Sequence, residues 1–422
     1  MKHKTNRPHF ATRAIHAGQR PDPSTGAVMT PIYATSTYVQ ESPGKHLGYE
    51  YSRTQNPTRG AYESCVADLE NGSNGFAFAS GMAAISTVLE ILDSGDHVIS
   101  MDDLYGGTYR LFENVRRRSS KLDFSFVDMT NPHSLIEKIK PSTKMIWIET
   151  PTNPLLRIVD LSAVSAIAKE HGLIAVCDNT FASPYIQRPL DHGIDIVVHS
   201  ATKFIGGHGT SIGGVVIESG DFDWGSGRFP QMTEPSPGYN NLRFWENFGE
   251  LAFCTKLRAE QLRDIGASLS PFNAFLLLQG LETLPQRMDE HVANARSVAQ
   301  FLTGHDAVDW VAYAGLSDSP YYDLAQRYFP KGPGAVFTFG VADGREAAGR
   351  FIESLELVSH LANVGDARTL VIHPASTTHQ QLSDEDLEAG GLTPEMVRLS
   401  VGLEDIEDIL YDLAQALDRA RV

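Results

Sequence analysis

From Thr58 onward, short apolar runs alternate with longer segments in which apolar residues recur every three or four positions. The runs predict buried β-strands, and the periodic segments predict amphipathic helices. Strands are expected at residues 75–79, 97–100, 122–127, 144–148, 173–177, 194–198 and 214–217. Helices are expected at residues 59–70, 82–92, 108–118, 132–139 and 161–171. Near-continuous apolar strands that alternate with helices indicate an α/β fold with a mostly parallel sheet covered on both faces.

The pattern changes on either side of this region. Residues 221–238 are rich in glycine, proline and aromatic residues, which is typical of a functional loop or an insertion. Further helices are expected at residues 242–267, 272–284, 288–302, 345–355 and 405–420, and further strands at 335–339 and 397–401. The first residues follow no clear period but contain several tyrosines, which disordered tails lack, so we expect an arm held by another part of the assembly.

These changes of pattern predict three parts. The arm comprises residues 1–57, and a large domain comprises residues 58–270 with the insertion at about 221–249. A smaller C-terminal domain comprises residues 271–422. A chain of 422 residues is long enough for two domains with a large core.

Composition narrows the class of protein. The chain is 42% hydrophobic and carries a formal net charge of −17, which argues against nucleic acid or an anionic membrane as a partner. The three cysteines, Cys65, Cys177 and Cys254, are far apart and odd in number. That pattern excludes a disulfide framework and fits a reducing cytoplasm. No apolar run approaches the roughly 18 residues that a membrane-spanning helix requires.

The segment His199-Ser200-Ala201-Thr202-Lys203 is the strongest candidate for chemistry. It follows the apolar run at residues 194–198, and a glycine-rich stretch at residues 204–210 comes next. Ligands of open α/β sheets bind at the C-terminal ends of strands. A lysine at that edge is well placed to form a Schiff base with an aldehyde cofactor. A lone lysine after a strand is more often a surface residue, so this interpretation depends on the rest of the chain.

Two further side chains follow strand ends. Asp178 closes the run at residues 173–177, where a carboxylate can pair with a protonated pyridine nitrogen and keep the ring able to accept electrons. The alternative is an aspartate that caps the next turn. Tyr105 follows the strand at residues 97–100, and its ring can stack on a flat cofactor. The alternative is a structural tyrosine in a turn.

A phosphate site is predicted from Ser80-Gly81-Met82, between a strand and an amphipathic helix. Ser80 is typical of an N-cap, and Gly81 lets an anion approach the free N–H groups of the first turn. The alternative is an ordinary capped helix. Ser200 and Thr202 can add hydroxyl donors to the same phosphate. All of these residues lie at strand ends of one sheet, where they can converge.

Two other types of site are disfavoured. A nicotinamide site needs GxGxxG opening a helix after a strand, and Gly207-His208-Gly209 lacks the third glycine at that spacing. Several histidines, His199, His208, His373 and His379, suggest a metal, but no HExxH motif or paired Cys/His spacing occurs. We therefore expect no metal site.

Taken together, these motifs resemble the Cys/Met-metabolism family of fold-type I pyridoxal-phosphate enzymes. That family includes cystathionine γ-synthases, cystathionine γ-lyases, methionine γ-lyases and O-acetylhomoserine sulfhydrylases. The resemblance runs from about Ala14 to Ala420 and rests on residues 178–184 and 198–203. It implies a mostly parallel seven-stranded sheet covered by helices, plus a smaller α+β C-terminal domain. It also implies pyridoxal 5′-phosphate as the cofactor.

The resemblance assigns roles to individual residues. It implies that Lys203 bears the cofactor, that Asp178 partners the pyridine nitrogen, and that Tyr105 stacks on the ring and shuttles protons. The implied phosphate ligands are Ser80, Gly81, Met82, Ser200 and Thr202. Asn153 resembles the residue near the phenolic oxygen. The implied substrate-binding residues are Arg398, which resembles the clamp on the α-carboxylate, together with Asn363, Arg110 and Tyr51.

The arm acquires a role from the same resemblance. Tyr51 and Arg53 match residues that reach the phosphate of a neighbouring subunit, so they join the cofactor-binding set. A dimeric catalytic unit is implied, in this family usually within a homotetramer. The expected partners are therefore a second copy of the chain and small amino-acid and thiol substrates.

The exact reaction is less determined, because the two halves resemble different members. Up to about Thr202 the chain is most similar to bacterial cystathionine γ-lyases and synthases, and after Lys203 to the sulfhydrylases. Cystathionine-handling members commonly carry a glutamate ahead of the His-Pro-Ala motif at residues 373–375, and counting back places Ala362 there. A second amino acid would lack that charged partner, whereas sulfide needs none. At Gly107, methionine γ-lyases typically carry a cysteine.

We therefore predict γ-replacement on O-acetyl-L-homoserine by sulfide or a small thiol, giving homocysteine or methionine. Cystathionine γ-lyase or γ-synthase activity is the main alternative, because the same site can eliminate. A non-catalytic α/β binding module is the remote alternative.

Overall fold

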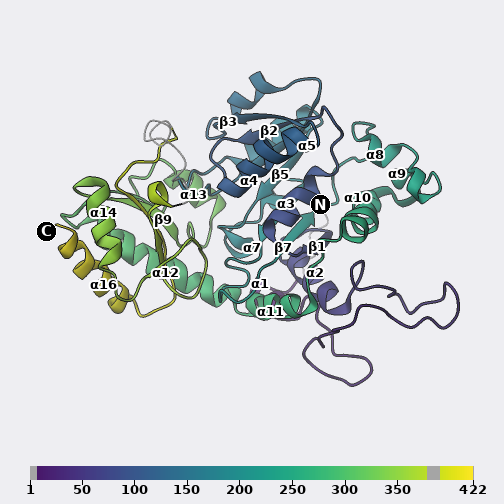
Figure 1. The fold of residues 1–422 in the computed structure, drawn as a ribbon, viewed down its shortest axis with the longest axis horizontal. Coiled ribbons are helices and arrows are strands. Elements are labelled where there is room, and N and C mark those ends of the chain that lie inside the picture. Colours follow the sequence, from purple (N-terminus) through teal and green to yellow (C-terminus); the bar gives the residue numbers. More distant parts are fainter. Residues whose placement is uncertain (1–6, 378–389, 422) are drawn as a thin grey trace.

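The computed structural model describes residues 7–377 and 390–421. Its centre is a seven-stranded sheet in the order β1-β7-β6-β5-β4-β2-β3 (Figure 1). The strands are β1 (Asn74–Phe78), β2 (His97–Met101), β3 (Asp123–Val127), β4 (Thr143–Glu149), β5 (Ile174–Asp178), β6 (Ile196–Ser200) and β7 (Gly214–Glu218). Strands β6, β5, β4, β2 and β3 are parallel neighbours, whereas β7 is antiparallel to β6 and to β1. The mostly parallel sheet predicted from the sequence is confirmed.

Helices cover this sheet. Those of the first half are α1 (Phe10–His16), α2 (Pro57–Leu69), α3 (Gly81–Leu89), α4 (Gly106–Arg110), α5 (Arg117–Ser119), α6 (Leu161–Glu170) and α7 (Ser183–Ile186). Asn56 caps α2 by accepting the N–H groups of Thr58 and Arg59, and a proline at the first turn has no N–H to satisfy. The segment expected as a helix at residues 132–139 forms a 3₁₀-helix at Pro132–Lys138.

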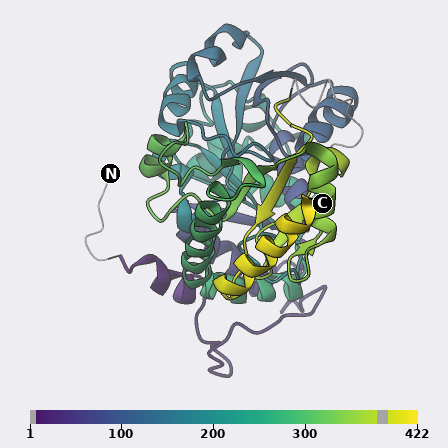
Figure 2. The same cartoon turned by 90° about the vertical axis from the view of Figure 1, so that its left-hand side faces the viewer.

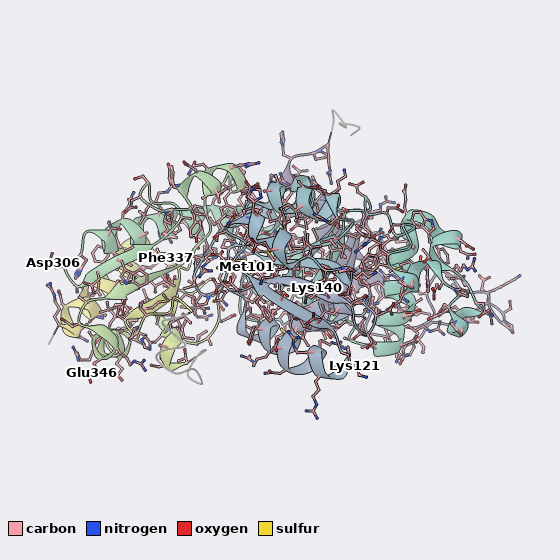
Figure 3. The ribbon with its side chains drawn as sticks, turned by 90° about the horizontal axis from the view of Figure 1, so that it is seen from above. Met101, Lys121, Lys140, Asp306, Phe337 and Glu346 are labelled. Carbon is pink, nitrogen blue, oxygen red and sulfur yellow. The ribbon has the colours of Figure 1, made fainter. Side chains whose placement is uncertain are left out.

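The smaller domain is built on a five-stranded sheet in the order β10-β11-β12-β9-β8. Its strands are β8 (Val308–Ala312), β9 (Val336–Val341), β10 (Ser359–His360), β11 (Leu370–Ile372) and β12 (Met396–Ser400). Its helices are α13 (Tyr322–Tyr328), α14 (Gly344–Glu353) and α16 (Ile406–Ala420). Figure 2 shows α16 running along the outer side of this domain. In Figure 3, Phe337 lies inside the domain, and Asp306 and Glu346 lie at its outer end.

Helix α12 (Leu284–Thr303) follows α11 (Pro271–Glu282) and carries a row of buried polar side chains. Arg287 Nη1 donates to the carbonyl of Phe204 (2.8 Å), and His291 Nδ1 lies 2.7 Å from the carbonyl of Val401. Asn294 donates to the next carbonyl after Val401, at 3.2 Å. One helix face therefore holds the loop that follows Lys203 and the segment that follows β12.

Some expected boundaries are wrong for identifiable reasons. The strand expected at 194–198 is β6 (Ile196–Ser200), because its pairing with β5 starts at Ile196 rather than where the apolar run begins. The helix expected at 108–118 contains a π-helical stretch at Leu111–Arg116 between α4 and α5. The helix expected at 242–267 is broken, since Gly249 has φ +54° directly after α9 (Phe244–Phe248).

The rest of that segment forms α10 (Ala252–Lys256) and a π-helical stretch at Leu257–Ile265. Together with α8 (Pro230–Thr233) these helices project from the sheet at one end of the molecule (Figure 1). The arm from Gly18 to Gln55 contains no helix and also extends away from the body (Figure 1). Its apolar side chains Val28, Val39 and Leu47 are 79%, 92% and 81% exposed.

Candidate functional site

A cavity of about 340 Å³ lies where the C-terminal ends of the parallel strands face the smaller domain. Its volume is within the range of small-molecule sites, roughly 300–1,000 Å³. Most residues predicted for the site line it: Ser80, Gly81, Met82, Tyr105, Arg110, Asn153, Asp178, Ser200, Thr202, Lys203, Asn363 and Arg398. Tyr51 and Arg53 are not among its lining residues.

Lys203 lies in the turn that follows β6, with its amine inside the cavity wall. Its Nζ donates to Asn363 Oδ1 at 2.5 Å. Burial lowers the pKa of Lys203 to about 8, and the charge of nearby Arg398 contributes in the same direction. A large share of the amine is therefore neutral near pH 8, which is the form that attacks a carbonyl.

Asp178 is the last residue of β5 and is almost fully buried. Its Oδ1 accepts the N–H of Thr180 at 3.1 Å and the hydroxyl of Thr180 at 2.5 Å. Burial raises the pKa of Asp178, while the Thr180 hydrogen bonds and the nearby His199 act against that rise. Asp178 therefore both caps the turn at Thr180 and lines the cavity.

The predicted phosphate end is built on the first turn of α3. Ser80 Oγ accepts the N–H of Ala83 at 3.1 Å, as expected of an N-cap. The N–H groups of Gly81 and Met82 belong to the first turn and have no partner within the helix. Gly81 packs so closely on Ser200 that an added Cβ would lie 2.7 Å from the Ser200 Cβ.

Tyr105 is the N-cap residue of α4, and its side chain is 46% exposed beside the cavity. The main chain of Gly107 lies against the ring, since an added Cβ would come within 2.4 Å of Tyr105 Cε1. The N–H of Tyr105 donates to the carboxyl of Glu149, at 3.1 and 3.0 Å from its two oxygens. The backbone of Tyr105 is therefore held in place, one side of its ring packs on Gly107, and part of the ring remains exposed beside the cavity.

The smaller domain contributes the other wall. Arg398, on β12, donates from Nη1 to Asn153 Oδ1 at 2.6 Å and is 6% exposed. Burial lowers the pKa of Arg398 to about 10, so it remains cationic at neutral pH. Ala362 also lines the cavity from this domain, whereas Arg110, the last residue of α4, lines it from the large domain.

Two lining residues with polar side chains were missed by the sequence analysis, Glu149 and Thr180. Glu149 closes β4 as Asp178 closes β5, so the same signal, a carboxyl residue after an apolar strand, was present. Thr180 follows Asp178 within the segment that carries the family resemblance, and its hydroxyl also accepts the N–H of Ser200 at 2.8 Å.

Tyr51 and Arg53 lie together on the arm, with the Arg53 guanidinium 5.0 Å from the centre of the Tyr51 ring. Tyr51 is 41% exposed. Their predicted function in a neighbouring subunit's site stays a prediction.

The residues present fit pyridoxal 5′-phosphate. Unpartnered first-turn N–H groups and hydroxyls at one end suit a phosphate, and the buried Asp178 suits a pyridine nitrogen. Lys203 has a lowered pKa and lines the same cavity. The close approach of Gly81 to Ser200, which only a glycine permits, brings the first turn of α3 and the end of β6 together at the phosphate end.

Metal clusters and membrane-spanning helices are both absent from the described residues. Within residues 7–377 and 390–421, no group of three or more His, Cys, Asp or Glu side chains is arranged to hold a metal ion. His379, one of the histidines noted above, lies outside the described residues. Across the same ranges, every helix is too short or too polar to cross a membrane.

Comparison with known proteins identifies one family. A family model described as "Cys/Met metabolism PLP-dependent enzyme" matches residues 11–418. An O-acetyl-L-homoserine sulfhydrylase from Leptospira meyeri is 46% identical, with 96% of each chain covered. A cystathionine β-lyase from Coxiella burnetii is 48% identical, covering 97% of this chain and 98% of that protein.

A solved structure from Campylobacter jejuni, described as an O-acetylhomoserine (thiol)-lyase, superposes with a TM-score of 0.93 at 36% identity. It covers 97% of this chain and 100% of the other, and it holds N′-pyridoxyl-lysine-5′-monophosphate.

Proposed function

This chain belongs to the Cys/Met metabolism PLP-dependent enzymes, and from that premise we propose that it replaces the acyloxy group of O-acetyl-L-homoserine with sulfide or a small thiol. One observation carries the choice of reaction. Among the described residues that line the cavity, the only carboxyl groups are Glu149 and Asp178, both at strand ends of the large sheet. Arg110 lines the cavity from α4, and the opposite wall, from the smaller domain, holds Arg398 and Ala362. That wall suits a substrate with one amino group and an ester, and it has no carboxylate for the second amino group of cystathionine.

Pyridoxal 5′-phosphate, when bound, supplies an electron sink that stabilises negative charge on carbons next to the substrate amine. We assign Lys203 as its point of attachment and Asp178 as the partner of its ring nitrogen. Tyr105 provides the stacking face. The first turn of α3, with Ser200 and Thr202, holds the phosphate.

The protein groups then bind the substrate and move protons. Arg398 binds the α-carboxylate, and its guanidinium is oriented by Asn153 Oδ1, which accepts from Nη1 at 2.6 Å, and by the carbonyl of Asn363, which accepts from Nη2 at 3.4 Å. Lys203 removes the α-proton and then the β-proton, because its lowered pKa provides a neutral amine near pH 8. Tyr105 carries protons to and from the leaving acetate and the entering thiol. Asn363 holds the Lys203 amine between these steps.

We further propose a cytoplasmic enzyme that acts as a dimer of catalytic dimers. Two features support a second copy as partner: the apolar residues of the arm are exposed, and Tyr51 and Arg53 are absent from the cavity of their own chain. In the assembly these two residues would complete a neighbouring subunit's phosphate site and substrate site.

The test is a comparison of substrates on the purified protein reconstituted with pyridoxal phosphate. Turnover of O-acetylhomoserine with sulfide is expected to exceed turnover of cystathionine alone. Lys203→Ala is the inactive control, and Ala362→Glu is expected to shift the ratio toward cystathionine by adding a carboxylate to the wall. Faster turnover of cystathionine by the wild type would overturn the choice.

Cystathionine lyase activity is the second candidate, because the Coxiella burnetii relative at 48% identity is named a cystathionine β-lyase. A visible absorption band that borohydride removes, and that Lys203→Ala lacks, would exclude a protein that merely keeps the fold. Without such a band the enzymatic proposal fails in both versions.

A further inference from the structure

Glu149 occupies a central position that the proposed function leaves unused. It is the last residue of β4, is 5% exposed, and lies in the wall of the cavity. In the pairing of β4 with β5, Glu149 is directly opposite Asp178. Residues paired in a parallel sheet point to the same face, so two carboxyl groups stand side by side where the cofactor ring is expected.

The contacts of Glu149 extend to both other parts of the site. Its two oxygens lie 3.1 and 3.0 Å from the backbone nitrogen of Tyr105, and the backbone N–H of Asn153 is close enough to act against the rise in its pKa. Asn153 in turn accepts a hydrogen bond from Arg398 at 2.6 Å. One carboxyl group thus fixes the base of the stacking ring and the loop that orients the carboxylate clamp.

The surroundings of Glu149 favour its neutral form. It is buried, and the titratable groups that face it are Asp178 and Cys177 on β5 and Asp103 on the segment after β2. Burial first, and then the charge of Asp178, hold the pKa of Glu149 well above its usual range. Burial raises the pKa of Asp178 too, but the hydroxyl and N–H of Thr180 and the nearby His199 act against that rise, so Asp178 is the member of the pair that ionises more readily.

A purely structural carboxyl group at this position would need only to satisfy backbone donors, which an amide oxygen does equally well. Glu149 differs from such a group in its place: it contacts the residues before α4 and after β4 from within the cavity wall, opposite Asp178. Moving it therefore moves the stacking ring and the clamp together.

We propose that Glu149 is a positioning residue that holds Tyr105 and the Asn153–Arg398 pair in place around the cofactor site and leaves Asp178 to pair with the ring nitrogen. This inference rests on the proposed function only in assuming that pyridoxal phosphate and an amino acid bind here. Its consequences are separate effects on cofactor affinity, through Tyr105, and on substrate affinity, through Arg398.

The experiment compares Glu149→Gln and Glu149→Ala with the same changes at Glu218. Glu218 is a matched control because it is a buried strand-end glutamate, 1% exposed, that accepts an N–H, from Trp224 at 3.0 Å. It lies at the end of β7 that is far from the cavity, paired with Ile196 at the start of β6. The measurements are the Kd of pyridoxal phosphate for the apoenzyme, the pH dependence of the bound cofactor's spectrum, and KM and kcat separately.

Glu149→Gln keeps a neutral acceptor, so its Kd, KM and spectral pH midpoint should stay within about threefold or 0.5 pH unit of wild type. Glu149→Ala leaves the N–H of Tyr105 without its acceptor and removes the contact with the Asn153 segment, and both Kd and KM should rise roughly tenfold. The Glu218 variants should leave both constants unchanged. If Glu149→Ala does not fold, Glu149→Asp, which withdraws the acceptor by one methylene, should still raise Kd.

Two results would overturn the proposal. Equal effects of alanine at positions 149 and 218 would show that Glu149 has no positioning role. A Glu149→Gln variant as impaired as Glu149→Ala, with a shifted spectral midpoint, would show that the residue acts as a carboxylate. If the wild type binds the cofactor but does not use O-acetylhomoserine, the proposed function fails, while the Kd and spectral comparisons still decide the role of Glu149.

Discussion

The amine of Lys203 should react with pyridoxal phosphate at a pH where ordinary lysines hardly react. Its pKa is lowered from 10.5 to about 8, first by burial and then by the charge of Arg398. At pH 7.5 about a quarter of such an amine is neutral, against about 0.1% of an unperturbed lysine. That difference gives roughly 250-fold more of the nucleophilic form at the same pH.

The assay is the rate of covalent cofactor uptake by the apoenzyme between pH 6 and 10, normalised to a free amine of ordinary pKa. The rate should rise with pH and level off above a midpoint near 8. Arg398→Leu should move the midpoint upward, by less than the full return to 10.5, because burial is the larger cause. Arg398→Lys keeps the charge and should leave the midpoint in place.

Substitution of Asn363 should shift the pH midpoint in the opposite direction to Arg398→Leu. Its Oδ1 accepts a hydrogen bond from the Lys203 amine, and such a bond is stronger when the donor is charged. Asn363→Ala should therefore lower the midpoint, whereas Arg398→Leu raises it. A wild-type midpoint above about 9.5, or shifts of the same sign in both variants, would refute the reasoning about what perturbs this lysine.

Three further predictions follow from other contacts. Gly81→Ala places a Cβ 2.7 Å from the Ser200 Cβ and should weaken cofactor binding by about tenfold in an apoenzyme titration, whereas Gly60→Ala, with open space around the added atom, should not. Burial raises the pKa of Glu218 to about 7, so its stabilising contribution is present below pH 4.5 and is lost as the pH rises through 7. Glu218→Gln should therefore gain thermal stability relative to wild type between pH 5 and 7, and a constant difference would contradict this. Arg287→Met removes the donors to three backbone carbonyls and should lower the free energy of unfolding by about 3 kcal/mol in urea denaturation, and a loss below about 1 kcal/mol would show that those carbonyls find other partners.

The sequence was most informative where chemistry coincides with strand ends. Lys203 and Asp178 were found because each is a reactive side chain directly after an apolar run, and the parallel sheet brings such ends to one edge. Glu149 shows the same signal but was passed over, because its position opposite Asp178 follows from strand order, which the pattern of hydrophobic residues does not encode.

The direction of each strand could not be predicted from the sequence either. The run that forms β7 has the same apolar character as its neighbours, yet β7 runs antiparallel between β6 and β1. The helix break at Gly249 depends on a positive φ that many glycines do not adopt. Contacts between chains leave no periodic signal, so the position of Tyr51 relative to a partner is undetermined by sequence spacing alone.

Helix α12 has a consequence for how substrates are admitted. From this one helix, Arg287 binds the loop after Lys203, and His291 binds the segment directly after β12. Arg398 lies on β12 itself. Rotation of one domain against the other, as in enzymes that close about a hinge, would break these buried hydrogen bonds. The distance between the Lys203 amine and the Arg398 guanidinium is therefore set before a substrate binds. Selection among amino acids then depends on the fixed shape of the cavity rather than on domain closure.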